Sequence, residues 1–173
     1  PKLGHYLPLV EQIINQSTQR IVHGISVPND EKLFSLFEEH TELLKRGKAG
    51  KPIEFGHKVL ISQTGEKFIH HYKVMEKRID DKDLLGPAVE AYKDLFGRYP
   101  KLLSTDKGFY ENMKQITELE TKITTVSIAK KGRRNANEYE RETTESFIAG
   151  QRFRAGSEGS ISVLKRAFKL GKC

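Results

Sequence analysis

The sequence predicts an α/β fold in which helices cover a mixed sheet. Two apolar runs, at 53–61 and 68–75, have the period of β-strands, and a four-residue turn containing glycine joins them as in a hairpin. In the second half, short β-rich runs at 101–105 and 123–128 alternate with segments of helical spacing. Strands that alternate with helices are typical of a sheet covered by helices.

The N-terminal third is predicted to be helical. Residues 6–23 place apolar side chains at helical spacing, and a turn at 27–31 leads into a short amphipathic helix over 33–37. The glycines and the proline at 46–52 indicate a loop. We therefore expect a helical segment over residues 1–50 that leads into a core over residues 51–173.

Three further helices are predicted between and after the strands. The first covers 80–96, with acids in its first turn and Gly97 as its stop. The second covers 108–119. For the last helix, through about residue 169, Ser157 is the predicted N-cap.

Composition narrows the class of protein. A chain of 173 residues can bury a sizeable core, and no apolar run approaches the roughly 20 residues that span a bilayer. The first residues lack the apolar region and the cleavage site of a signal peptide. Cys173 is the single cysteine, which excludes an internal disulfide or a cysteine-based zinc site. We expect a cytoplasmic protein with no membrane partner.

Positive charge is concentrated at the C-terminal end. Residues 130–173 carry eleven Lys and Arg against five Glu, whereas residues 1–129 carry nineteen against eighteen acids. A basic region on a near-neutral body is the pattern of a nucleic-acid-binding protein. Charge alone supports a solvated basic surface equally well.

Two carboxylates stand out as candidate metal ligands. Asp106 follows the predicted strand at 101–105, and sites in such sheets form at the carboxyl ends of strands. Glu158 lies in the predicted first turn of the last helix, with bases on both sides. Taken singly, Asp106 could be a helix cap and Glu158 could complement a helix dipole. Together they predict a Mg²⁺ site that acts on a phosphodiester.

The other candidate motifs are weaker. The six histidines lack zinc-site spacing, and the segment 47–51 lacks the spacing of a phosphate-binding loop. A basic cluster follows the predicted strand at 123–128, in a polar stretch read as a loop or an exposed helix. We expect it to contact phosphate, with a solvated loop as the alternative. Its members are Lys130, Lys131, Arg133 and Arg134.

Four blocks of the sequence resemble the catalytic region of bacterial insertion-sequence transposases of the DDE type, most closely the ISNCY group. The blocks run in family order over residues from about 20 to 170. They are Glu31–Thr41 (EKLFSLFEEHT), Arg46–Val59 (RGKAGKPIEFGHKV), Thr105–Tyr110 (TDKGFY) and Gly150–Arg166 (GQRFRAGSEGSISVLKR).

The resemblance implies an RNase H-like core whose acids bind two Mg²⁺ or Mn²⁺ ions and catalyse DNA strand nicking and transfer. Asp106 would be the second aspartate and Glu158 the glutamate of the catalytic set. The implied partners are DNA, as terminal repeats and as target, and further copies of the chain assembled on it. A bacterial, nucleoid-associated location follows. The resemblance also assigns DNA-phosphate contacts to the basic residues around the glutamate, which are Arg152, Arg154, Lys165 and Arg166.

The sequence departs from the family pattern at its start. The family's first catalytic aspartate lies on the first core strand, and we predict no strand before residue 53. We therefore expect an incomplete core, a piece of a transposase that is inactive by itself because two-metal catalysis needs the missing ligand. Two alternatives remain open: a non-catalytic DNA-binding remnant of a transposase, or an RNase H-like nuclease.

Overall fold

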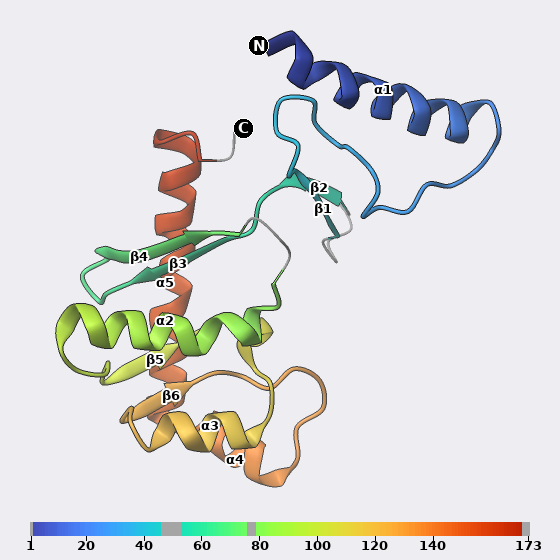
Figure 1. Ribbon diagram of the computed structural model, residues 1–173. Coiled ribbons are helices and arrows are strands. Elements are labelled where there is room, and N and C mark those ends of the chain that lie inside the picture. Colours follow the sequence, from blue (N-terminus) through green and yellow to red (C-terminus); the bar gives the residue numbers. More distant parts are fainter. Residues whose placement is uncertain (1, 46–52, 76–78, 171–173) are drawn as a thin grey trace. The chain divides into compact units, whose positions relative to one another are not determined.

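The computed structural model describes residues 2–45, 53–75 and 79–170; the loop predicted at 46–52 lies outside them. The described residues form a mixed α/β structure. In chain order the elements are α1 (Lys2–Ile21), β1 (Glu42–Lys45), β2 (Ile53–Gly56), β3 (Val59–Gln63), β4 (Ile69–Val74), α2 (Asp81–Phe96), β5 (Leu102–Ser104), η1 (Lys107–Phe109, a 3-10 helix), α3 (Met113–Glu120), β6 (Thr125–Ser127), α4 (Ala136–Thr143) and α5 (Glu145–Ala167) (Figure 1).

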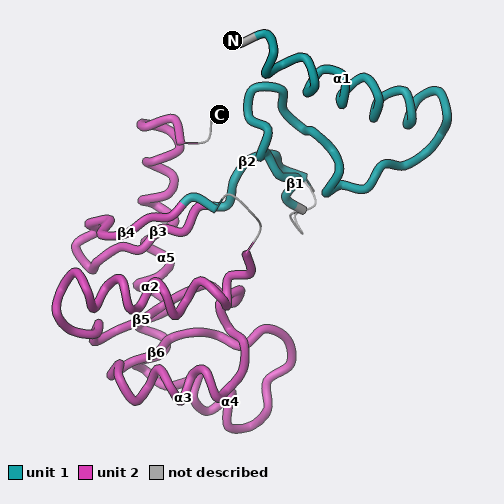
Figure 2. The backbone as a smooth tube through the Cα atoms, in the orientation of Figure 1, with its two compact units in different colours: residues 1–58, 74–78 teal, residues 59–73, 79–173 magenta. Residues whose placement is uncertain are grey.

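The chain divides into two compact units. Unit 1 comprises residues 1–58 and 74–78, and unit 2 comprises residues 59–73 and 79–173 (Figure 2). Unit 1 holds α1 and the antiparallel pair β1–β2, in which Leu43 lies opposite Phe55. The prediction of a helical segment up to residue 50, with no strand before residue 53, is therefore wrong, because β1 pairs with β2. Unit 2 holds the helices and strands that carry both candidate carboxylates.

The helix predicted at 33–37 does not form. Those residues are irregular, and Leu33 is buried. The side chain of Gln16 on α1 explains the difference, because its Oε1 accepts from the Leu33 amide at 3.0 Å and its Nε2 donates to the Leu33 carbonyl at 2.9 Å. These two bonds satisfy the amide and the carbonyl of Leu33, which would otherwise need hydrogen-bond partners within a helix.

The alternating run at 53–61 is divided into two strands. Gly56 ends β2 with a φ of 141°, a backbone conformation that side chains disfavour. The chain resumes as β3, which pairs with β4 and so confirms the predicted hairpin. In its turn, the Thr64 amide donates to the Phe68 carbonyl at 2.8 Å.

Helix α2 matches its prediction closely. It begins at Asp81, with Asp81 and Asp83 in the first turn, and Gly97 follows it in the left-handed conformation at φ 68°. The Gly97 amide donates to the Lys93 carbonyl at 2.7 Å, which closes the last turn.

The two strands of the second half form a parallel pair. Ser104 lies opposite Ser127 at their carboxyl ends. Neighbouring residues of a strand point to opposite faces, so Leu103 packs against the core on one face while Leu102 meets α5 on the other. The pair therefore lies between α2 and α3 on one side and α5 on the other.

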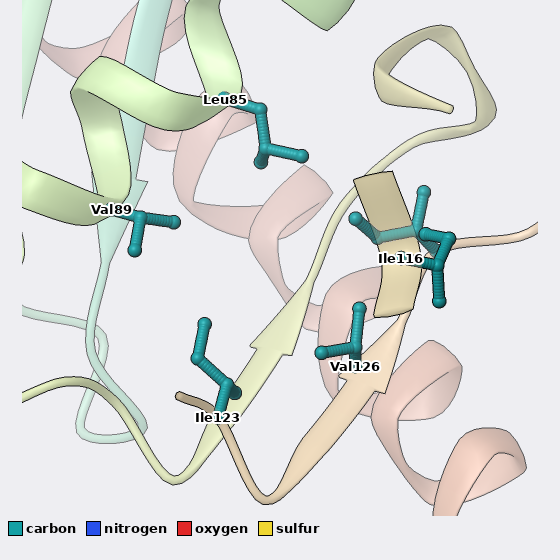
Figure 3. Close-up of a cluster of buried hydrophobic side chains, with 6 residues drawn as sticks. Leu85, Val89, Ile116, Ile123 and Val126 are labelled. Atoms are coloured by element: carbon teal, nitrogen blue, oxygen red, sulfur yellow. The ribbon is translucent and has the colours of Figure 1, made fainter. Parts of the chain in front are cut away.

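The core of unit 2 lies on the α2 side of this pair. Figure 3 shows Leu85 and Val89 of α2 pointing across to Val126 of β6 and Ile123 just before it. Ile116 of α3 is fully buried beside them. Burial of each such side chain stabilises the fold by roughly 1.5–3 kcal/mol relative to exposure.

The single mixed sheet expected from the sequence is not formed. The described strands make three separate two-stranded sheets, β1–β2, β3–β4 and β5–β6. Strands β5 and β6 have three residues each, which limits their ladder to few hydrogen bonds. Among the described helices, none combines the length and the apolar character needed to cross a membrane.

Candidate nucleic-acid and metal interface

Asp106 lies on the surface just beyond β5. Its place at the carboxyl end of a strand is confirmed, since β5 ends at Ser104. Its carboxylate Oδ1 accepts a hydrogen bond from the Lys107 amide at 2.7 Å and so caps η1. The capping role weighed for this residue is thus present in the structure, and it leaves the residue open to solvent.

Contrary to the prediction, Glu158 does not lie at the start of a helix. Helix α5 begins at Glu145, where the Thr144 hydroxyl accepts from the Phe147 amide at 3.4 Å, and runs without a break to Ala167. Ser157 is therefore not an N-cap; its hydroxyl donates to the Arg154 carbonyl at 2.7 Å inside the helix. Glu158 sits in the middle of α5, so a helix dipole does not explain it.

Gly150 lets α5 approach the parallel strands closely. A Cβ at this position would lie 2.5 Å from the Ser127 Cβ and 3.2 Å from the Leu102 Cδ1. Polar contacts fix the helix there: the Ser127 hydroxyl donates to the Phe147 carbonyl at 2.8 Å, and the Gln151 Nε2 donates to the Ser127 carbonyl at 2.6 Å. Helix α5 is therefore anchored at the carboxyl end of β6.

The anchor also sets the direction in which Glu158 lies. Residues seven apart on a helix differ in direction by only about 20°, so Glu158 is on the same side of α5 as Gln151, about 10 Å further along. The Glu158 side chain is 70% exposed. Its Oε1 lies 3.5 Å from Nη2 of Arg154, one turn earlier.

The two acids offer the ligand type that Mg²⁺ and Mn²⁺ prefer. Both are exposed carboxylates, which suits an ion that keeps several waters. In the described part of the chain, no hydrogen bond or ion pair joins Asp106 to Glu158, and no three His, Cys, Asp or Glu side chains gather as a metal site. The residues thus fit a hydrated ion as partial ligands, and their joint role stays a prediction.

Half of the predicted basic cluster is neutralised by the protein itself. The Lys130 ammonium lies 2.6 Å from Oε2 of Glu138, and Arg134 lies 3.3 Å from Oε2 of Glu142. Both glutamates are almost fully buried. A charge paired in this way adds less to phosphate attraction than a free one, although phosphate contact by Lys130 and Arg134 stays a prediction.

The remaining basic candidates differ in their pairing. Arg154 is committed to Glu158, as described above. The other five basic candidates are exposed, and none of them has an ion-pair partner among the described residues. They are Lys131, Arg133, Arg152, Lys165 and Arg166.

Sequence reasoning missed the buried acid network that holds the loop after β6. Glu138 accepts from the Lys130 ammonium, from the Tyr110 hydroxyl at 3.2 Å and from the Asn135 amide at 2.8 Å. The hydrogen bond from Lys130 is the main cause that holds the pKa of Glu138 below its ordinary value. The spacing of Asn135 and Glu138 is that of a capping box, a signal that could have located α4.

Arg141 on α4 is the second missed residue. Its Nη1 donates to the Val126 carbonyl at 3.2 Å and its Nη2 to the Ile128 carbonyl at 2.7 Å, at the end of β6. The guanidinium also lies over the Phe147 ring, 5.0 Å from its centre. One side chain therefore ties α4, β6 and α5 together.

No family model matches the chain, and neither a curated protein nor a solved structure matches it.

Proposed function

We propose that this chain is part of the catalytic region of a DDE-type transposase that acts on DNA. In the proposal Asp106 and Glu158 supply two of the carboxylates that hold Mg²⁺ or Mn²⁺, and the unpaired bases of α5 and of the loop after β6 hold DNA phosphates. The RNase H-like core implied by the resemblance belongs to the same proposal.

One relationship carries the proposal. Asp106 lies just beyond the end of β5, and α5, the helix that carries Glu158, is anchored by Gln151 at the carboxyl end of the neighbouring β6. Both acids thus belong to unit 2, Asp106 just beyond a strand end and Glu158 on the helix that is anchored at the neighbouring strand end. Sites in open α/β sheets form at such strand ends.

The residues around Glu158 suit a phosphodiester substrate. A bound divalent ion would activate the attacking oxygen and stabilise the leaving oxygen. The protein's own part is to hold the ion through the two carboxylates and to place phosphates through exposed bases. Arg154 keeps Glu158 in a charge-balanced state, so an arriving ion would compete with the guanidinium for that carboxylate.

A non-catalytic DNA-binding remnant is the second candidate. The observation that favours it is the lack of a third metal ligand beside Asp106 and Glu158 among the described residues. An RNase H-like nuclease is the third, and it would cleave RNA–DNA hybrids without a preference for terminal repeats.

Measuring DNA affinity at several salt concentrations tests DNA binding, which the transposase and the non-catalytic remnant have in common. Each phosphate contact adds about 0.9 to the slope of log affinity against log salt. We expect the double variant Lys165→Ala, Arg166→Ala to reduce that slope by nearly two, measured by fluorescence anisotropy with a labelled duplex.

The matched control is the double variant Arg98→Ala, Lys114→Ala. It removes one lysine and one arginine from exposed positions outside the basic region, so the net charge changes by the same amount. Equal losses in the two double variants would mean that only net charge matters, and this would overturn the assigned DNA surface.

A further inference from the structure

Helix α1 carries an apolar stripe that the described residues of unit 1 leave exposed. Its members are spaced by four, three, four and seven residues, and their exposed fractions range from 37% to 81%. On a helix this spacing keeps all of them within a narrow band. The members of this α1 stripe are Leu3, Leu7, Val10, Ile14 and Ile21.

A different face of α1 holds the rest of unit 1. Gln16 binds the Leu33 backbone, Gln12 donates to the Glu31 carbonyl at 3.0 Å, and the Tyr6 ring packs edge-on against Phe37. On the helix, Gln12 and Gln16 lie about 150–170° around from the α1 stripe, and Tyr6 lies about 70° from it. The contacts that hold α1 in unit 1 therefore leave the stripe free for another partner.

The spacing of the α1 stripe is that of a coiled-coil seam. Alternating steps of three and four residues define the a and d positions of a heptad, with Leu7, Ile14 and Ile21 at a. Ser17 completes the series at d as a small polar member. Coiled coils tolerate a polar residue in the seam, at a cost in stability.

Size and charge both favour a second copy of this chain as the partner. The five side chains expose on the order of 500 Å² per helix, so two copies would bury about 1,000 Å², the lower limit for a specific interface. The flanking e and g positions are mostly uncharged, with Tyr6 and Ile13 at g and Thr18 at e. In a parallel pair Ile13 would face Thr18 of the second copy, and no like charges would oppose each other.

We propose that α1 pairs with α1 of a second copy of this chain, forming a short two-helix coiled coil along the α1 stripe. The pairing uses unit 1 alone. It does not depend on the proposed DNA function, and either proposal can fail without the other.

Sedimentation equilibrium of the full chain over a wide concentration range tests the pairing. We expect a monomer–dimer equilibrium for the wild type and a monomer for Ile14→Lys, which places a charge in the seam. Asn15→Lys is the control: it adds the same charge to an exposed neighbouring position off the α1 stripe and should still dimerise. Circular dichroism should show equal helix content in all three.

A cysteine in the seam gives a second, independent readout. With Cys173 replaced by serine, Ser17→Cys should form a disulfide-linked dimer under mild oxidation if the helices are parallel and in register. An antiparallel pair would place Cys at 17 opposite Leu7 and give a non-covalent dimer only. A wild type that stays monomeric at every concentration, or an Ile14→Lys variant that still dimerises, would overturn the proposal.

Discussion

The Gln151 side chain donates to the Ser127 carbonyl oxygen, 2.6 Å away, at the point where β6 ends. Its Nε2 also lies 3.1 Å from the Ser127 hydroxyl oxygen. Ser127 is fully buried, so these bonds satisfy polar groups that water cannot reach. This relationship fixes the position of α5 on the parallel strands, and the direction of Glu158 follows from it.

Substituting Gly150 by alanine should disturb that anchor. The added Cβ would clash with Ser127, so α5 must move away from the strands, and we expect a loss of about 1–3 kcal/mol in the free energy of unfolding. Gly156→Ala is the matched control, since no atom lies within 4 Å of its added Cβ. There we expect a gain of about 0.5–1 kcal/mol from helix propensity. Urea denaturation of both variants measures the difference, and equal stabilities would contradict the close approach.

Arg141→Lys should destabilise unit 2. A single ammonium cannot reach both the Val126 and the Ile128 carbonyls, so one buried oxygen loses its donor at a cost of roughly 1–3 kcal/mol. Arg134→Lys is the comparison, because that side chain is 45% exposed and a lysine can keep its pairing with Glu142. Thermal unfolding of the two variants checks the prediction. A similar small effect in both would show that the two carbonyl contacts contribute little.

Stability at acid pH should depend on Glu138. Lys130 holds the pKa of Glu138 below its ordinary value of 4.5 in the folded chain. A lowered pKa adds stability above pH 4.5, and that stability is lost as the pH falls through the folded-state pKa. We expect Glu138→Gln to be less stable than the wild type at neutral pH and to approach it in acid.

Urea unfolding between pH 3 and pH 7 measures this pH dependence. Glu118→Gln is the control, because Glu118 is exposed and lies 4.0 Å from Lys114. The free energy of unfolding of this variant should change with pH as that of the wild type does. Parallel pH profiles for Glu138→Gln and the wild type would refute the role of the buried pair.

Sequence patterns were sufficient where local signals agreed with packing. The hairpin β3–β4 has alternating side chains around a glycine turn, and α2 has acids at its start and Gly97 at its end. The start of α5 was missed because Ser157 has the residue type of an N-cap, whereas the helix begins at Glu145 and continues through Gly150 and Gly156. Packing on Ser127 stabilises the helix through Gly150, a tertiary effect that local propensity does not contain.

The candidate site could be predicted only in part. The position of Asp106 just beyond the end of a strand can be predicted from composition and turn signals. The direction of Glu158 depends on the Gln151 anchor, and the pairing of Lys130 with Glu138 depends on how α4 folds back on the loop. Both are contacts between residues far apart in sequence, which periodicity does not reveal. The prediction of a short helix at 33–37 failed for the same reason, because the Gln16 side chain bonds the Leu33 backbone instead.

Calorimetric titration with Mn²⁺ tests the proposed metal site most directly. We expect measurable binding by the wild-type chain and its loss in both Asp106→Asn and Glu158→Gln. The asparagine can still cap η1, so a structural loss at Asp106 is avoided. Glu145→Gln, an exposed acid on the same helix as Glu158, should bind Mn²⁺ like the wild type. No heat in the wild type, or unchanged heat in both site variants, would contradict the metal role and favour the non-catalytic remnant.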